Sequence, residues 1–347
     1  MKTQVAVRSG FRSIDPSIYP SKFLSNLGIF CVLFFAATFL RAQASSAAGT
    51  AQVYTVITNE ALHDDGDPPM LEAGDAKVRQ GKTPLKVDQL IPARGDNAAL
   101  QLFILIDDTL DSGIGNSLND IRDFINAQPA TTVIAVGYMS NATVQIVQNF
   151  TADHALAAKS IRLPFGQLST MDSPYLSLIS LVKGWPEQKV RREIVMVSDG
   201  IDRLRAWQGG GLGPGFGPVF HSIPTISPDV DSASEICQRY NAIVYSLYAH
   251  GVGRATRNSW GLQNGLNSLG KLTDETGGDL FSLGTSSLVS FKPYLDRLQK
   301  ILNNQYYVVF QAAAKKKAGL QRINFSTEVP NAEIVAPDNV WVPAAKN

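Results

Sequence analysis

Residues 101–111 read Gln-Leu-Phe-Ile-Leu-Ile-Asp-Asp-Thr-Leu-Asp, a mostly apolar run that ends in carboxylates. A short, uninterrupted apolar run is typical of a strand that is buried on both faces, as in the middle of a parallel sheet. Open α/β sheets bind their ligands at the carboxyl ends of such strands. Asp107, Thr109 and Asp111 are spaced two residues apart, so a tight loop can direct several of their oxygens toward one hard cation. This stretch therefore predicts both the class of fold and the place of a functional site.

Strand-like and helix-like segments alternate from residue 100 onward. Strands are predicted at 100–106, 132–138, 143–149, 193–198 and 243–249. Helices, in which apolar residues recur on one face, are predicted at 116–127, 172–183, 231–240, 259–276 and 287–303. Such alternation predicts an α/β fold with a doubly wound, mainly parallel sheet that carries helices on both faces.

Smaller β-rich segments flank the alternating region. Residues 52–58 alternate like a strand, Gly81 lies in a predicted hairpin turn, and residues 304–310 form a strong strand candidate. The expected organisation is a targeting segment at 1–44, a linker and β-rich extension at 45–98, the α/β domain at 99–312, and C-terminal strands and tail at 313–347.

The composition narrows the class of protein. The chain has 347 residues, of which 44% are hydrophobic and 18% are charged, so a globular core is expected and wholesale disorder is not. The formal net charge of +1 gives no general electrostatic reason to bind nucleic acid. The four histidines show no spacing typical of a zinc site.

The first 44 residues predict export from the cytoplasm. Basic residues precede an apolar run from Leu24 to Leu40, and Ala42-Gln43-Ala44 then offers small residues for signal peptidase. An uncleaved membrane anchor is the alternative, and it would be the only attachment to a membrane. We therefore expect a periplasmic or secreted protein. After cleavage only Cys237 remains, which excludes an intramolecular disulfide.

A second predicted strand also ends in carboxylates. The strand at 193–198 runs into Asp199 and Asp202. Arg203 and Arg205 follow Asp202, and they are expected to form local salt bridges or to meet an acidic partner. Between the two acidic strand ends lies Ser173-Pro174, a good pair for the start of a helix.

At these residues the chain resembles the von Willebrand factor A (VWA) domain. The metal-ion-dependent adhesion site of that family uses an Asp-x-Ser-x-Ser loop, a Thr from a second loop and an Asp from a third. The matching positions here are residues 107–111 for the first loop, Ser173 or else Thr170 for the second, and Asp199 for the third. The order and the spacing both fit, and the resemblance implies a VWA-like, Rossmann-like α/β fold.

The resemblance extends over most of residues 53–343. Residues 74–82 are similar to a phrase that precedes the domain in a group of acidobacterial-type VWA-related secreted proteins. Residues 302–308 are similar to the last helix-to-strand junction of that group, and residues 276–281 are similar to the turn before the final sheet strand.

The resemblance implies a non-catalytic, adhesion-type protein of the bacterial cell envelope that binds another protein. Asp107, Thr109, Ser173 and Asp199 would hold Mg²⁺ or Mn²⁺, and an acidic side chain of the partner would complete the octahedron. Asp111 stands where the family has Ser, which makes this a degenerate form of the site. A ligating Asp111 would partly neutralise the ion; otherwise it points away and leaves Ser112 to act.

Two other functions stay open. The first is a metal-free scaffold or assembly protein of the envelope, whose acidic loops cap helices or bind water. The second is a metal-dependent hydrolase with two ions, which needs more ligands than the sequence offers. The Gly-rich stretch at 209–218 lacks the ending of a phosphate loop and is predicted to be a mobile surface or contact loop.

Overall fold

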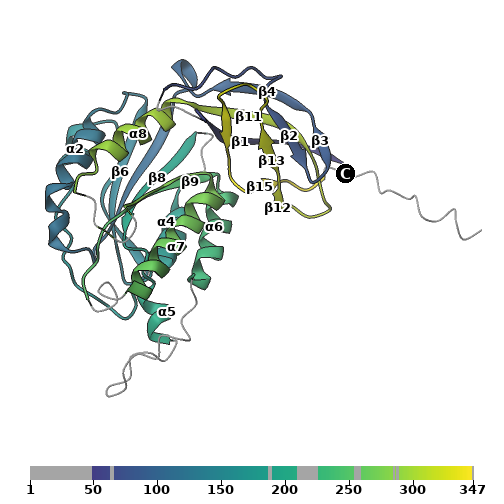
Figure 1. Ribbon diagram of the computed structural model, residues 1–347. Coiled ribbons are helices and arrows are strands. Elements are labelled where there is room, and N and C mark those ends of the chain that lie inside the picture. The colour runs from purple at the N-terminus through teal and green to yellow at the C-terminus, as the bar shows by residue number, and fades with distance from the viewer. Residues whose placement is uncertain are drawn as a thin grey trace, which may run out of the picture. The chain divides into compact units, whose positions relative to one another are not determined.

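The computed structural model describes residues 49–62, 66–186, 190–208, 226–253, 259–283, 286 and 289–345. Predictions for the targeting segment and for the Gly-rich stretch fall outside these residues. Among the helices that the structure describes, none is both long and apolar enough to cross a membrane. Figure 1 shows the chain and labels most of its helices and strands.

A six-stranded sheet forms the centre of the fold. Its strands in spatial order are β7 (Thr143–Thr151), β6 (Thr132–Ser140), β5 (Leu100–Asp107), β8 (Arg191–Ser198), β9 (Ala242–Tyr248) and β10 (Leu280–Phe281). All neighbouring pairs are parallel except β6 and β7, which are antiparallel. From β5 the strand order runs outward in both directions, so the switch point of a doubly wound sheet lies between β5 and β8. The predicted α/β class, with a doubly wound, mainly parallel, Rossmann-like sheet, is confirmed.

Helices cover both faces of this sheet. One face packs against α2 (Leu118–Asn126), α3 (His154–Lys159) and α8 (Lys292–Asn303). The other face packs against α4 (Pro174–Gly184), α6 (Pro228–Arg239) and α7 (Ser259–Thr276). Because both faces are covered, β5 and β8 are buried at every residue. This burial explains the apolar runs at 102–106 in β5 and 194–197 in β8, and it also encloses Arg191, Arg192 and Glu193 at the start of β8.

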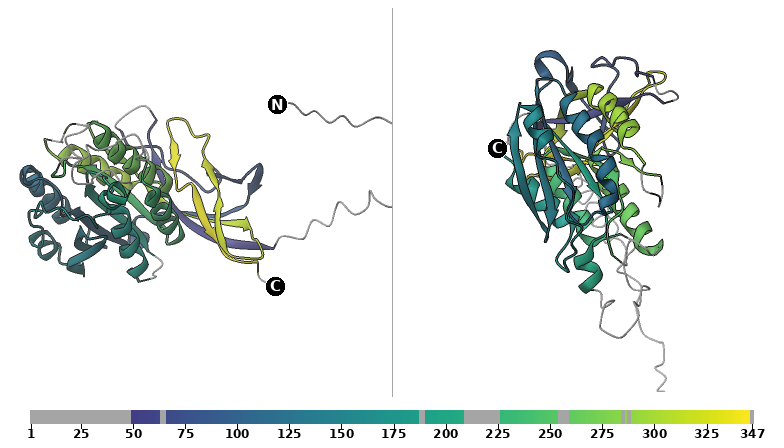
Figure 2. Two further views of the ribbon diagram at one scale, coloured as in Figure 1. Left: turned by 90° about the horizontal axis from the view of Figure 1, so that it is seen from below. Right: turned by 90° about the vertical axis from the view of Figure 1, so that its left-hand side faces the viewer.

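The strands near the two ends of the described chain form a second, antiparallel sheet. Its order is β14 (Glu333–Val335), β1 (Thr50–Glu60), β11 (Gln305–Ala313) and β4 (Val87–Pro92). The longest pairing runs from Thr50 opposite Ala313 to Thr58 opposite Gln305. The purple β1 and the yellow-green β11 accordingly lie side by side in Figures 1 and 2.

Two small sheets complete the β-rich part. One has the order β13 (Asn324–Ser326), β2 (Lys77–Gln80) and β3 (Thr83–Leu85), and the other pairs β12 (Gly319–Arg322) with β15 (Asn339–Val342). The predicted hairpin turn is confirmed between β2 and β3, where Gly81 has a φ of 60°. That conformation suits glycine, which has no Cβ.

Several boundaries differ from the prediction. Residues 112–116 form a 3₁₀ turn, η2, so that the predicted helix at 116–127 begins only at Leu118. The predicted helix at 287–303 begins at Lys292. Besides η2, three short helical elements were not predicted: α3, α5 (Arg203–Gln208) and the 3₁₀ turn η1 (Gly95–Asn97).

Candidate functional site

Two carboxylates lie at the switch point of the six-stranded sheet. Asp107 is the last residue of β5, and Asp199 follows β8 directly. The two residues are 3% and 0% exposed, so both carboxylates depend on protein groups for compensation.

Asp107 is held by hydroxyl groups and one backbone amide. Its Oδ1 accepts hydrogen bonds from the backbone N–H of Thr109 at 3.0 Å and from the Thr109 hydroxyl at 2.7 Å. Its Oδ2 accepts from the hydroxyl of Ser198 at 2.8 Å. Burial, helped by the negative charge of Asp199 and opposed by Arg203, raises the pKa of Asp107 to about 6.

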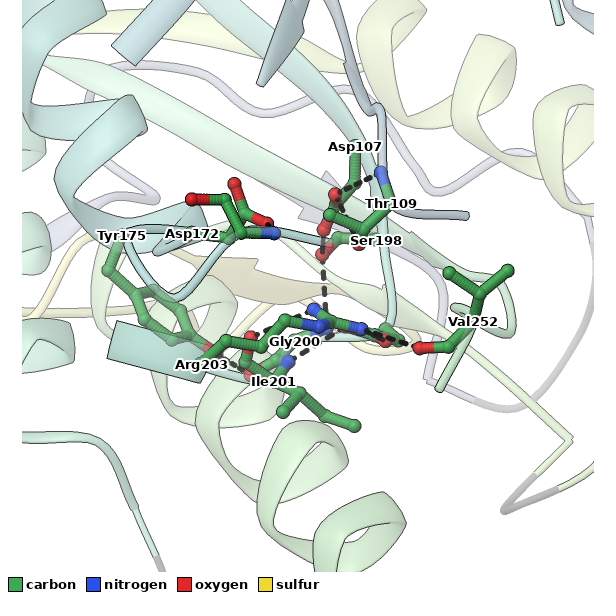
Figure 3. A network of polar contacts seen from close by, with 11 residues as sticks. Asp107, Thr109, Asp172, Tyr175, Ser198, Gly200, Ile201, Arg203 and Val252 are labelled. Atoms are coloured by element: carbon green, nitrogen blue, oxygen red, sulfur yellow. Dashed lines mark hydrogen bonds and ion pairs between the residues drawn. The ribbon is translucent and has the colours of Figure 1, made fainter. Parts of the chain in front are cut away.

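Asp199 forms a buried ion pair with Arg203, the first residue of α5. Arg203 Nη2 donates to Asp199 Oδ2 at 2.6 Å, and Nη1 donates to Oδ1 at 3.3 Å. The backbone N–H of Ile201 also donates to Oδ1, at 2.9 Å. The Arg203 side chain is only 9% exposed. Both oxygens of Asp199 are thus engaged by groups of its own chain. Figure 3 shows the polar network around Arg203, Ile201 and Asp107.

The electrostatics of Arg203 involve more than one carboxylate. Burial lowers the pKa of Arg203, but the charges of Asp199 and Asp107 outweigh this effect and the pKa is raised above its ordinary value. Asp172 acts in the same direction. The guanidinium is therefore the positive centre of an acidic environment.

Ser173 and Asp172 come from the loop before α4. Ser173 caps that helix by accepting from the backbone N–H of Leu176 at 3.3 Å. Asp172 accepts from backbone N–H groups on both of its oxygens, with Asn141 at 2.8 Å and Ser169 at 2.6 Å. These two side chains, Asp107 and Arg203 line a hollow of about 10 Å³.

Asp111 is directed elsewhere. Its side chain is exposed and caps η2, where Oδ1 accepts from the backbone N–H of Gly113 at 2.8 Å. Ser112 and Thr170, the two alternative hydroxyl donors, are exposed as well. The structure thus gathers Asp107, Thr109, Ser173 and Asp199 around the switch point, and it leaves Asp111 outside that group.

In this arrangement the gathered residues do not fit a resident Mg²⁺ or Mn²⁺. Mg²⁺ needs about six oxygens at about 2.1 Å, including waters. Both oxygens of Asp199 are bonded to Arg203, and the adjacent hollow is at the lower limit for one water molecule. Within the described ranges, no three His, Cys, Asp or Glu side chains are grouped so that they could hold a metal ion. The metal site stays a prediction.

Exposed apolar side chains lie in the loop between α3 and α4, close to this network. We call the following four residues the apolar rim: Leu163, Phe165, Leu168 and Met171, which are 50%, 64%, 49% and 52% exposed. Large apolar side chains that gather on a surface mark contacts with other molecules.

The loop that carries the apolar rim is anchored to the end of β5. Arg162 forms a two-pronged ion pair with Asp108, at 2.7 and 2.9 Å, and the backbone N–H of Phe165 donates to the same carboxylate at 2.9 Å. The guanidinium carbon of Arg162 lies 3.8 Å from the ring centroids of Tyr138 and Phe165. Phe165 is therefore held in place although its ring faces solvent.

Some residues of this region were not predicted from the sequence. Asp172, Ser198 and the apolar rim were missed, and Arg203 was expected only as a member of a local salt bridge or as a contact for an acidic partner. One signal was available for the rim, because four large apolar residues stand in a short stretch that also contains Pro164 and Gly166.

Comparison with known proteins gives similarity in structure only. No family model matches the chain, and no curated protein matches it. An aerotolerance-related membrane protein from Bacteroides fragilis is 12% identical, with a TM-score of 0.38, over 59% of this chain and 99% of that chain. BatB from Bacteroides thetaiotaomicron is 11% identical, with a TM-score of 0.36, over 58% and 98% of the two chains. The VWA domain of SpRpn10 is 11% identical, with a TM-score of 0.33, over 58% and 95%.

Proposed function

We propose that the chain is a non-catalytic, protein-binding module of the bacterial cell envelope with a VWA-like fold. Its partner contacts the carboxyl edge of the six-stranded sheet, at the apolar rim. The envelope location is proposed from the basic and apolar pattern of residues 1–44.

The observation that carries this proposal is the apolar rim beside a buried polar network. Protein interfaces use a few large apolar or aromatic side chains at their centre, and polar groups surround them. Phe165 fits that role, because it is 64% exposed and the Arg162 guanidinium already restricts its ring. A side chain that is ordered before binding loses less conformational entropy when the partner binds.

The polar network favours binding over catalysis. Asp107, Asp172 and Asp199 are occupied by hydrogen bonds within the chain, and the hollow that Asp107 and Asp172 line is about 10 Å³. A substrate needs a far larger cavity, typically a few hundred Å³. In this proposal the buried polar network stabilises the loops at the carboxyl edge of the sheet, and the apolar rim contacts the partner protein.

Among the alternatives, a metal-free binding or scaffold protein fits the site better than a metal-bridged one. A partner carboxylate would meet no free ion at this edge, because Asp199 is paired with Arg203. We accordingly expect chelators to leave partner binding unchanged.

The experiment is a binding titration with a matched pair of variants. The wild-type chain serves as bait in envelope extract, and the captured partner is identified, purified and titrated against each variant. Phe165→Asp is expected to weaken binding at least tenfold, which corresponds to about 1.4 kcal/mol. Ile146→Asp is the control, since Ile146 is also exposed (49%) but lies on the edge strand β7. Equal affinities of Phe165→Asp and wild type would contradict the proposal.

A further inference from the structure

The position of Arg203 has a consequence for metal binding that does not depend on any partner. Its guanidinium bonds both oxygens of Asp199. Arg203 also lines one hollow with Asp107 and Asp172, whose charges raise its pKa against the effect of burial. Planar guanidinium groups suit such two-pronged contacts with carboxylates, and they stay charged under all ordinary conditions.

The backbone encloses this ion pair closely. A Cβ on Gly251 would lie 2.0 Å from Asp199 Oδ2 and 2.7 Å from Arg203 Nη2. A Cβ on Gly265 would lie 2.1 Å from the backbone oxygen of Asp199. Glycine at both positions lets the chain approach the pair, which leaves little space for a hydrated ion beside it.

The charges at the switch point also indicate that no metal ion is needed there. Buried carboxylates without a counter-charge are costly, so the ends of β5 and β8 need a cation close by. In a metal-ion-dependent adhesion site, that cation is a divalent metal ion. Here the chain provides a cation four residues after Asp199, at the start of α5.

We propose that Arg203 is a built-in cation that takes the place of a divalent metal at the switch point of the sheet. The site is therefore metal-independent in the wild-type chain. Removing the guanidinium leaves Asp107 and Asp199 without their counter-charge and turns the site into one that binds a divalent cation through carboxylate and hydroxyl oxygens.

The test is a titration of the purified full chain with MnCl₂, followed by calorimetry and by thermal melting. The wild type is expected to show no saturable Mn²⁺ site at the switch point and the same melting temperature in Mn²⁺ and in EDTA. Arg203→Ala is expected to bind one Mn²⁺ per chain. Its melting temperature should rise by about 5 °C when free Mn²⁺ is about 100 times Kd, and EDTA should reverse the rise.

Two matched variants isolate the cause. Arg205→Ala removes a neighbouring arginine that pairs with Asp229, at 2.6 Å, and it should gain no Mn²⁺ response. Adding Asp199→Ala to Arg203→Ala should abolish the Mn²⁺ response of the single variant.

Two results overturn the inference. One is a saturable Mn²⁺ site in the wild type that Asp107→Asn abolishes. The other is a folded Arg203→Ala or Arg203→Gln chain that gains no Mn²⁺ binding. If both Arg203 variants fail to fold, the wild-type titration still tests the inference, because the inference predicts no saturable Mn²⁺ site in the wild type. Because the readouts are metal binding and melting, a failure here is distinct from a failure of partner capture at the apolar rim.

Discussion

Glu193 is a buried carboxyl group on β8 whose protonation is linked to stability. It is 0% exposed, and burial raises its pKa to about 8, although the nearby charge of Arg191 and the polar groups of Gln305 and Tyr245 oppose the shift. These polar groups lie near the carboxyl, but neither of its oxygens forms a hydrogen bond of good geometry with them. Desolvation is therefore the dominant effect.

The sign of the pH effect follows from the raised pKa. The folded state keeps the proton of Glu193, whereas the unfolded state releases it above about pH 4.5. The contribution of protonated Glu193 to the free energy of unfolding is therefore fully present below pH 4.5, and it is lost as the pH rises to 8. Glu193→Gln is expected to remove this part of the pH dependence and to exceed the wild type in stability at pH 8 by roughly 4 kcal/mol. Urea unfolding at pH 5, 6, 7 and 8 measures the difference. The exposed Glu235→Gln is the control, and parallel curves for Glu193→Gln and wild type would contradict the prediction.

Gly251 is a residue at which one methyl group should disrupt the ion pair. In Gly251→Ala the new Cβ would overlap Asp199 Oδ2 at 2.0 Å, so that Asp199 and Arg203 must separate or the loop must move. Overpacking together with a broken buried pair is expected to cost about 3 kcal/mol in the free energy of unfolding. Gly74→Ala is the control, because a Cβ there meets nothing within 4 Å. Chemical denaturation of both variants checks this, and equal stabilities would argue against a tightly enclosed pair.

For individual residues, the sequence predicted where the acidic side chains lie better than it predicted which groups they bind. Asp107 and Asp199 were expected at one edge, because parallel strands end together, and the structure places them there. The partner of Asp199 was not predicted, since a helix start four residues away brings Arg203 back onto the carboxylate and residue spacing alone does not reveal it. Asp111 was expected as a possible ligand, but a carboxylate that precedes a helical turn can instead cap it, as it does for η2.

At the scale of elements, a carboxylate of one helix caps another. Asp120 of α2 accepts through Oδ2 from the hydroxyl of Ser290 at 2.7 Å and from the backbone N–H groups of Phe291 at 2.8 Å and Lys292 at 3.2 Å. This contact joins residues about 170 positions apart and compensates free N–H groups at the start of α8.

Asp120→Ala is therefore expected to destabilise the fold by about 2 kcal/mol, because it removes a carboxylate that accepts three hydrogen bonds. Hydrogen exchange should quicken first at the beginning of α8, and urea unfolding gives the total cost. Asp123→Ala changes an exposed aspartate one turn later in α2 and should cost less than about 0.5 kcal/mol. A similar cost for the two variants would show that Asp120 does not act as the cap.

Long helices could be predicted from the sequence, whereas short helices could not. The helix α7 spans several turns, and its predicted range at 259–276 is confirmed. The helices α3 and α5 have six residues each, too few for a helical period to stand out. The start of α8 was placed too early because the cap on it, Asp120, is distant in sequence.

At the scale of the whole molecule, β1 at the beginning of the described chain pairs with β11, which directly follows α8. The alternation in residues 52–58 predicted a strand, but it indicates which side chains share a face and not which strand lies alongside. Val56 of β1 belongs to the same core as α8 and β5, and Arg191 of β8 donates to Gln305 of β11 at 2.7 Å. The β-rich part and the six-stranded sheet thus share apolar and polar contacts.

These shared contacts predict that both parts unfold together. Phe310 of β11 is fully buried in the β-rich core, where its ring centroid lies 5.7 Å from that of Phe325. Phe310→Ala should leave a cavity that costs about 3–5 kcal/mol. If the chain is one cooperative unit, this loss should lower the protection of amides in β5 and β8 as much as that of amides in β11. Hydrogen exchange read by mass spectrometry compares the segments directly. Loss of protection confined to β1, β4 and β11 would instead mean that the β-rich part opens by itself, and that the contacts of Arg191 and Val56 are too weak to couple it to the sheet that carries the site.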